Sequence, residues 1–209
     1  MILFICLKWA KRLTGIWHYD IKRRMKDDSD MSGYIMDLRR IVGHRTLMQC
    51  AASIIVENEK GQILLGKRTD NHMWSYSGGS VEIDEKVEAA AKRELLEEMG
   101  LVADSIEFFM VNSGPEVHYI YPNGDEVSNI EIIYICNQYH GEIKAQKEEM
   151  EQLRFFDPAE IDLEMISPPT RPVIQKYIEE KNEHLFCKTW GNRLEYSEKN
   201  PGDDRYTAE

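Results

Sequence analysis

The chain has 209 residues, which is enough for one domain of ordinary size together with additional segments. Its hydrophobic fraction of 42% can supply a core, so a wholly disordered chain is excluded. The formal net charge of -11 argues against general binding to nucleic-acid backbones. Phosphate-bearing small molecules remain candidate substrates, but metal ions would be needed to offset the repulsion from carboxylates.

The four cysteines are far apart and form no C-x-x-C pair, so neither a zinc site nor a disulfide framework is indicated. A reducing cytoplasm is the expected location. The longest apolar run at the start, Ile2 to Leu7, is far shorter than the roughly 20 residues that span a bilayer. It also lacks the basic lead-in and the cleavage site of a secretory signal, so neither a transmembrane segment nor export is expected.

Residues 1–35 combine many Lys and Arg side chains with apolar residues at helix-like spacing. One interpretation is a basic amphipathic helix that contacts a membrane surface or a partner. The interpretation that we favour is an appended leader, because Met31 and Met36 are both plausible starts. A chain that begins at Met36 is therefore expected to fold and to be active.

The next segments alternate between strand and turn patterns. Residues 46–57 and 62–68 are rich in β-branched and apolar side chains, and the turn residues 58–61 lie between them, so a hairpin is expected. A helix is expected over 84–99, with Gly100 just past its end. The remaining expected elements are strands at 105–111, 117–121, 127–139 and 153–156, a turn at 122–125, a helix at 171–181, and a polar tail at 182–209.

Three carboxylates occupy one face of the expected helix. Glu94, Glu97 and Glu98 stand at i, i+3 and i+4, in the last turns, where the helix dipole disfavours anions. A solvated acidic face is the alternative, but such a face usually carries Lys or Arg four residues on. The positions four beyond these glutamates are Glu98, Leu101 and Val102. The pattern therefore favours a divalent cation site.

Within this helix, opposite charges four residues apart occur only at Glu88 with Lys92 and at Arg93 with Glu97. Because the ligands would be hard oxygens with no nearby His or Cys, we expect Mg2+, with Mn2+ as a substitute, and not zinc. Gly78 and Gly79 come just before the expected helix. Glycines permit backbone conformations that are closed to other residues, and they leave a carbonyl free to approach a cation.

The apolar side of the same helix recurs every four residues, at Val87, Ala91, Leu95 and Met99. This spacing is typical of a helix that packs on a sheet.

These residues resemble a known family. Gly79, Glu85 and the run Arg93-Glu94-Leu95-x-Glu97-Glu98-x-Gly100-Leu101 are similar to the Nudix box, G-x5-E-x7-R-E-U-x-E-E-x-G-U, with every specified position filled. The resemblance implies an α/β fold, an α/β/α sandwich around a mixed β-sheet. It places a Nudix hydrolase domain at 36–181, and leaves 1–35 and 182–209 outside it.

The resemblance implies Mg2+-dependent hydrolysis of a nucleoside diphosphate linked to another moiety, with release of a nucleoside monophosphate. Carried over by position, Glu97 and Glu98 would bind the metal, and Glu94 would be a ligand or the base that orients water. The Gly79 carbonyl would be a further ligand. The remaining two residues with implied roles, which would support the ligands, are Glu85 and Arg93.

A further acid in this family often comes from a loop before a strand that ends in an aromatic pair. Glu148 and Glu149 precede the run 153–156, which ends in two phenylalanines, and Glu149 is our choice. The alternative is an acidic surface loop. The family commonly has Pro before the paired glycines, whereas Ser77 stands there, which puts the rigidity of that loop in doubt.

Two aromatic residues are candidates for substrate binding. Trp74 would either stack on a base or support its loop from the core. Tyr119 lies near the position where members that act on dinucleoside polyphosphates carry tyrosine, and Pro115 lies near the position favoured by ADP-ribose members. Both also suit a plain strand and a plain turn, so ADP-ribose, a nucleotide sugar, a dinucleoside polyphosphate or a damaged nucleotide all stay open as substrate. The long downstream motif of the NADH-cleaving members is not apparent, so that substrate is less favoured.

Two other functions are compatible with this fold. One is a regulatory module that binds a nucleotide without cleaving it, and the other is an isomerase of isoprenoid diphosphates. Non-catalytic modules tend to lose acids of the box and this chain has lost none, so hydrolysis is favoured. A homodimer is a further expectation, since many members of the family are dimers.

Overall fold

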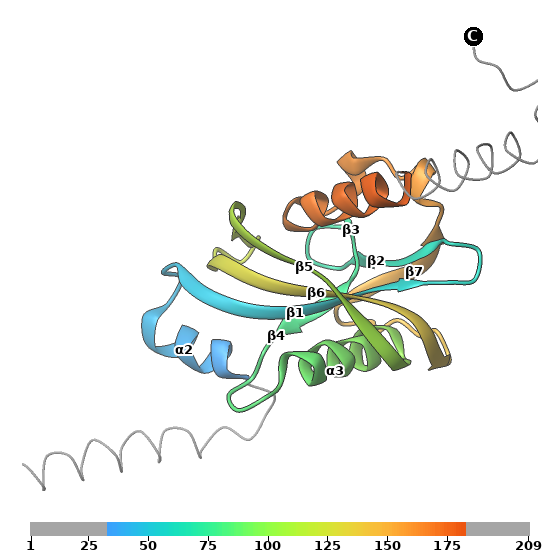
Figure 1. Ribbon diagram of the computed structural model, residues 1–209. Coiled ribbons are helices and arrows are strands. Elements are labelled where there is room, and N and C mark those ends of the chain that lie inside the picture. Colours follow the sequence, from blue (N-terminus) through green and yellow to red (C-terminus); the bar gives the residue numbers. More distant parts are fainter. Residues whose placement is uncertain (1–32, 183–209) are drawn as a thin grey trace, which may run out of the picture. The chain divides into compact units, whose positions relative to one another are not determined.

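The computed structural model describes residues 33–182. The expectations for 1–32 and 183–209 lie outside the described residues. In chain order the elements are α2 (Tyr34–Val42), β1 (Leu47–Glu57), β2 (Ile63–Arg68), β3 (Trp74–Ser75), β4 (Ser77–Ser80), α3 (Val87–Met99), β5 (Leu101–Ile120), β6 (Glu126–Gly141), β7 (Met150–Phe156), the 3-10 helices η1 (Pro158–Glu160), η2 (Leu163–Met165) and η3 (Pro168–Thr170), and a helix over 171–182 (Figure 1).

The described residues form two compact units, one of residues 33–45 with 82–84 and the other of 46–81 with 85–182. In the smaller unit, the Tyr34 N–H donates to Glu82 at 2.8 Å, and the Arg39 guanidinium donates to the carbonyl of Arg45 at 2.6 Å. The domain start expected at residue 36 falls inside α2. No helix among residues 33–182 is both long enough and apolar enough to cross a membrane.

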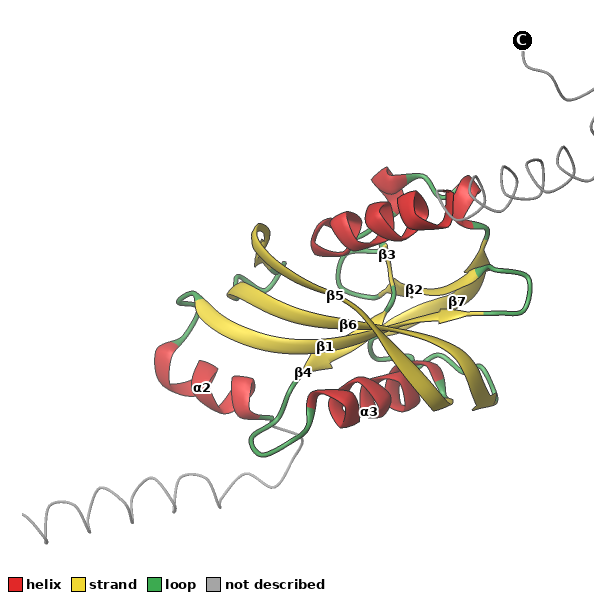
Figure 2. Ribbon diagram, viewed as in Figure 1, coloured by secondary structure: helices red, strands yellow, loops and turns green. Residues whose placement is uncertain are grey.

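The larger unit is built on a mixed sheet in the order β3-β2-β1-β6-β5, with β4 paired to β1 and β7 paired to β2. β1 and β6 run parallel, from Leu47 opposite Val127 to Val56 opposite Cys136, and the other pairs are antiparallel. Figure 2 shows α3 on one face of the sheet and the helix over 171–182 on the other. This arrangement confirms the expected α/β fold with helices on both faces.

Two apolar clusters explain these layers. One joins Ala91, Leu95 and Met99 of α3 to one face of β1, which confirms the apolar side expected for this helix. The other cluster joins Val173 and Tyr177 to the opposite face of the sheet. Because both faces of β1 are covered, residues 51–56 are buried without alternation.

Two expected boundaries are wrong. The helix begins at Val87 and not at residue 84, because Asp84 has a φ of 64°, which is left-handed and cannot start a helix. The two strands expected at 105–111 and 117–121 are one strand, β5, which pairs with β6 through several register shifts. Gly114 and Pro115 lie at one of these register shifts, between Ser113 and His118, so the strand continues past them. From the sequence alone these two residues suggest that the strand is interrupted.

The expected turns and the helix end are confirmed. Gly100 adopts a left-handed conformation, with φ of 73°, and its N–H donates to the Leu96 carbonyl. The β5–β6 turn closes with the Tyr121 N–H donating to the Asp125 carbonyl at 2.8 Å, and Gly124 has a φ of 88°. α3 and the β5–β6 hairpin are therefore placed by local chemistry that the sequence already shows.

Candidate active site

The paired glycines lie in β4, where Gly79 is opposite Ala52 and Gly78 is opposite Ser53 of β1. A Cβ on Gly78 would lie 1.9 Å from the Ser53 Oγ, and one on Gly79 would lie 2.4 Å from a carboxylate oxygen of Glu94. Neither glycine has a positive φ. The expectation that they supply unusual backbone conformations is therefore wrong, because they are needed for close approach instead.

Glu98 is the most enclosed acid of the helix. Its side chain is 2% exposed, and one of its oxygens accepts a hydrogen bond from the Gly78 N–H at 3.0 Å. Burial, together with the carboxylates of Glu94 and Glu149, raises the pKa of Glu98 to about 8. Within residues 33–182, Glu98 forms no ion pair with Lys or Arg, and its partners are the Gly78 N–H and, through a more distant electrostatic attraction, Arg68.

Arg93 organises the other acids of the box. It donates two hydrogen bonds to Glu85, at 2.9 and 3.0 Å, one to Glu94 at 2.7 Å and one to Glu97 at 3.1 Å. A further bond, to the Ser80 carbonyl, measures 3.0 Å. The hydrogen bonds to Glu85 are the main reason why the pKa of Arg93 is raised. One guanidinium thus offsets part of the acidic face, and among the described residues Arg93 forms no hydrogen bond or ion pair with Glu98.

Glu94 and Glu97 differ in their surroundings. Glu94 lies against Gly79, and burial raises its pKa, with Glu97 and Glu149 adding to the rise. The Glu97 side chain is 52% exposed and turns toward Arg93. Within the described part of the chain, no three His, Cys, Asp or Glu side chains lie close enough together, as placed, to enclose a metal ion.

Glu149 is brought to this cluster by its loop. The Gln146 N–H donates to the Glu98 carbonyl and the Lys144 N–H to the Met99 carbonyl, both at 3.0 Å. These carbonyls are free because the last turn of a helix has no intrahelical donors for them. The end of α3 therefore holds the loop that carries Glu149.

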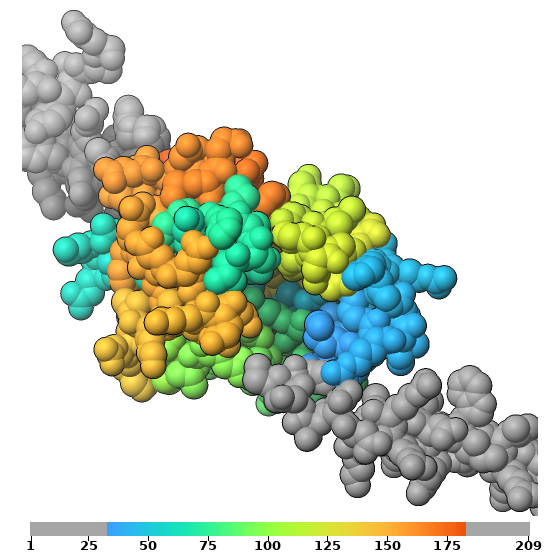
Figure 3. Space-filling view, turned by 180° about the vertical axis from the view of Figure 1, so that it is seen from behind, coloured from blue at the N-terminus to red at the C-terminus, as the bar shows by residue number. Residues whose placement is uncertain are grey.

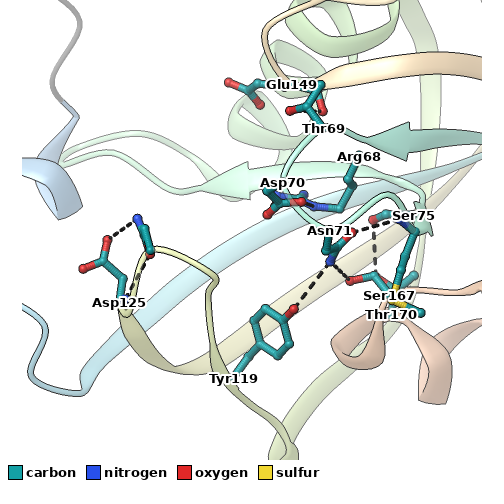
Figure 4. A network of polar contacts seen from close by, with 12 residues as sticks. Arg68, Thr69, Asp70, Asn71, Ser75, Tyr119, Asp125, Glu149, Ser167 and Thr170 are labelled. Carbon is teal, nitrogen blue, oxygen red and sulfur yellow. Dashed lines mark hydrogen bonds and ion pairs between the residues drawn. The ribbon is translucent and has the colours of Figure 1, made fainter.

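Thr69 holds the same loop from the other side. Its N–H donates to the Glu149 carbonyl at 2.9 Å, and its hydroxyl donates to the Glu148 carbonyl at 2.9 Å. Figure 4 shows Glu149 beside Thr69, at the start of the segment that follows β2. Nothing in the spacing of Thr69, about 80 residues before the acid, indicates this contact in the sequence.

A polar pocket adjoins the glycine pair. The space in it that the centre of a water molecule can reach is about 80 Å³. Figure 3 shows this region of the surface, where the β5–β6 hairpin lies beside the segment that follows β2. The hairpin and that segment are joined by Asn71, which donates to the Tyr119 hydroxyl at 3.4 Å and to the Ser167 hydroxyl at 3.3 Å (Figure 4). The residues that line the pocket include Ser53, Arg68, Tyr76, Tyr119, Tyr121, Asn129 and Glu131.

The two aromatic candidates have different positions. Tyr119 lines the pocket. Trp74 is 8% exposed and packs edge-on against Phe156, with ring centroids 4.7 Å apart, and it does not line the pocket. Of the two interpretations of Trp74, this position matches support of the loop from the core. Pro115 is exposed in β5.

The sequence pattern did not single out Glu131 or Arg68. Arg68 forms a two-pronged ion pair with Asp70, with both bonds at 2.9 Å, at the edge of the pocket. Glu131 stands between isoleucines in β6, and a charged residue inside an apolar strand is the signal that could have identified it.

A family model and several curated proteins match this chain. The family model described as NUDIX domain matches residues 48–177. The NAD-capped RNA hydrolase NudC of Actinobacillus succinogenes is 32% identical over 122 residues, which are 54% of this chain and 42% of that protein. An RNA pyrophosphohydrolase of Acinetobacter baylyi is 34% identical over 80 residues, 35% of this chain and 48% of that protein. The chain thus spans less than half the length of these curated relatives.

Solved structures agree in fold. The MutT NUDIX hydrolase of Burkholderia pseudomallei has a TM-score of 0.52 at 22% identity, with 62% of this chain and 97% of that one covered. The E. coli ORF135 protein has a TM-score of 0.51 at 25% identity, with 65% and 92% covered. At this level of identity the likeness to the MutT structure shows the fold alone.

Proposed function

Since the chain belongs to the Nudix family, we propose that it is a Mg2+-dependent hydrolase that cleaves the diphosphate bond of a nucleoside diphosphate linked to another moiety. The observation that carries the proposal is the packing of Glu94 and Glu98 against the glycine pair, which lines a polar pocket, with Glu149 near enough to raise the pKa of both acids. A nucleoside held in the pocket would place its phosphates next to these acids. The expected product is a nucleoside monophosphate.

The donor set fits a hard divalent cation. All candidate ligands are oxygens, and Glu98 is a buried carboxyl group that forms no ion pair among the described residues. The residues that would hold Mg2+, or Mn2+ in its place, are Glu94, Glu97, Glu98 and the Gly79 carbonyl. A bound divalent ion supplies charge to offset the diphosphate and lowers the pKa of a water molecule.

The chain's own residues have distinct roles in this proposal. Arg93 keeps Glu94 and Glu97 oriented through its hydrogen bonds, with Glu85 as its anchor. Glu149 accepts a proton from the attacking water. The oxygen of that water forms a bond to phosphorus, and the bridging P–O bond breaks, so that two phosphorylated products leave.

A substrate screen with product identification tests the proposal. We would incubate the full chain with ADP-ribose, nucleotide sugars, dinucleoside polyphosphates and, because one relative is named a hydrolase of NAD-capped RNA, a short RNA with that cap. The expected result is a nucleoside monophosphate or its RNA-linked equivalent, formed only with added Mg2+ or Mn2+. Binding without cleavage of any compound would support the non-catalytic module instead, and full turnover in excess chelator would contradict the metal site.

Thr69 provides a prediction about the placement of Glu149. Replacing Thr69 with Val keeps the shape of the side chain but removes the hydroxyl that donates to the Glu148 carbonyl. We expect Thr69→Val to lower kcat on the order of tenfold, since such supporting contacts typically affect activity by 10- to 100-fold. Thr69→Ser, which keeps the hydroxyl, should retain most of the activity. Equal losses in the two variants would show that the hydroxyl has no positioning role.

The proposal includes a cytoplasmic location and a small-molecule nucleotide as the binding partner. The thiols of Cys50 and Cys136 are both free, which suits a reducing compartment. A homodimer stays a prediction, for which sedimentation of the full chain is the measurement.

A further inference from the structure

Glu131 is a carboxyl group at the floor of the pocket. The Ser53 hydroxyl donates to one of its oxygens at 2.5 Å, and the Tyr76 hydroxyl donates to the other at 3.0 Å. The Asn112 side chain is a third donor. A carboxylate has about four acceptor positions, so one position is left for a group in the pocket.

The groups that hydrogen-bond to Glu131 are polar and uncharged, and Arg68, which lines the same pocket, pairs with Asp70. Its three partners are neutral, and among residues 33–182 it forms no ion pair. Burial raises its pKa, while these three hydrogen bonds oppose the rise. Such a group is held in place by neutral donors and has no cation as a partner, so it suits a ligand that offers hydrogen-bond donors.

Asn129 supplies a second acceptor on the same side of β6. It precedes Glu131 by two residues, so the two side chains project from the same face of the strand. The Asn129 side-chain oxygen is buried and has no hydrogen-bond partner in the structure. Buried polar atoms in native proteins are normally paired, so this atom points to a ligand that donates to it.

The walls of the pocket suit a flat ring. Tyr119 and Tyr121 pack edge to face with ring centroids 5.0 Å apart, and both line the pocket together with Tyr76. Aromatic walls contribute stacking and edge contacts to a planar heterocycle and contribute less to a sugar. Gly78 and Gly79 belong to the same lining, so a ring in the pocket lies next to the acidic cluster.

We propose that Glu131 is a specificity-determining residue that, with Asn129, selects a nucleobase whose edge offers two adjacent hydrogen-bond donors. Guanine has this edge, with its N1–H and its 2-amino group. Adenine offers one donor beside a ring nitrogen acceptor, and that acceptor would face the Glu131 oxygen. This inference rests on the proposed function only for the assumption that the ligand is a nucleotide.

Binding of GMP and AMP to the full chain tests the inference. The two compounds share their sugar and phosphate, so the ratio of their Kd values, measured by calorimetry in Mg2+, reports the base alone. We expect GMP to bind at least about tenfold more tightly, which is typical of one well-placed pair of base contacts. Inosine monophosphate, which lacks the 2-amino group, should bind with intermediate affinity.

The variant Glu131→Gln should bring the ratio to within about threefold of one, because Gln offers one donor and one acceptor in the same volume. The control is Glu126→Gln on the same strand, whose carboxylate pairs with His118 at 2.8 Å and does not line the pocket. This control should keep the wild-type ratio. Should Glu131→Gln not fold, Asn129→Ala takes its place, since it removes an acceptor that has no partner to lose, and it should lower the ratio several-fold.

Three results would overturn the inference: tighter or equal binding of AMP, an unchanged ratio in folded Glu131→Gln, or no measurable binding of either nucleotide. Hydrolysis without base preference would overturn this inference and leave the proposed function standing. Base-selective binding without hydrolysis of any diphosphate would overturn the proposed function and leave this inference standing.

Discussion

Replacing Glu98 with Gln is expected to lower turnover on the order of 1,000-fold while the protein stays folded. Glu98 is buried beside the glycine pair, and the substitution keeps its volume but removes its charge from the proposed cation site. A divalent ion stabilises the transition state by several kcal/mol, and each tenfold change in rate corresponds to 1.4 kcal/mol. Turnover of the best substrate from the screen, with the metal concentration varied, is the measurement.

The thermal stability of the same variant separates a metal ligand from a structural residue. Above pH 8 without metal, Glu98 is ionised and is repelled by Glu94 and Glu149, so at such a pH Glu98→Gln should have an unchanged or higher Tm in chelator. The increase in Tm on adding Mg2+ should be smaller than in the wild type. A residue that only supports the fold would instead lower Tm in chelator.

The matched control for Glu98 is Glu88→Gln. Glu88 is an exposed glutamate in the first turn of the same helix, away from the glycine pair. The variant Glu88→Gln should keep nearly full activity and the wild-type increase in Tm on adding Mg2+. Equal and mild losses in the two variants would defeat the metal-site assignment and would favour the non-catalytic module.

The second large effect concerns the metal-free protein, whose free energy of unfolding should fall as pH rises from about 5 to about 8. The pKa of Glu98 is about 8 in the fold, against an ordinary value of 4.5 for a glutamate. Between these values the folded state binds a proton that the unfolded chain has released, and raising the pH removes that stabilisation. The raised pKa of Glu94 acts in the same direction. The expected loss from Glu98 is on the order of 3 kcal/mol.

Urea denaturation in chelator at several pH values measures this dependence. Glu98→Gln should remove most of the fall, and Mg2+ should reduce it in the wild type, since a bound cation favours the ionised carboxylates. The comparison between variant and wild type matters because other groups titrate as well: burial also raises the pKa of Glu131. The same slope in the variant and the wild type would show that Glu98 is not the group responsible.

Much of the fold could be predicted from the chain because the relevant interactions are local. The strands 47–57 and 63–68, the turn before Ile63, the end of α3 at Gly100 and the β5–β6 turn all follow from side-chain pattern and turn residues. The apolar side of α3 follows from its spacing of four residues. Such features depend on residues within about one turn of helix or one hairpin, so periodicity and capping indicate them directly.

The acidic face of α3 was also predictable, but the surroundings of each acid were not. A spacing of three and four residues places Glu94, Glu97 and Glu98 together on any helix. It does not say that Glu97 turns to Arg93 while Glu98 is buried against Gly78. That difference depends on how closely β4 packs on the helix.

The sequence by itself therefore determined the family, the mixed α/β architecture and the acids of the box, since these depend on composition and on short spacings. Only the tertiary structure decided that Thr69 holds the loop of Glu149, that Trp74 lies in the core, and that Glu131 lies at the floor of the pocket. These positions arise from strand pairing and loop contacts between residues tens of positions apart. No local pattern encodes such contacts, because they form only when distant segments pack together.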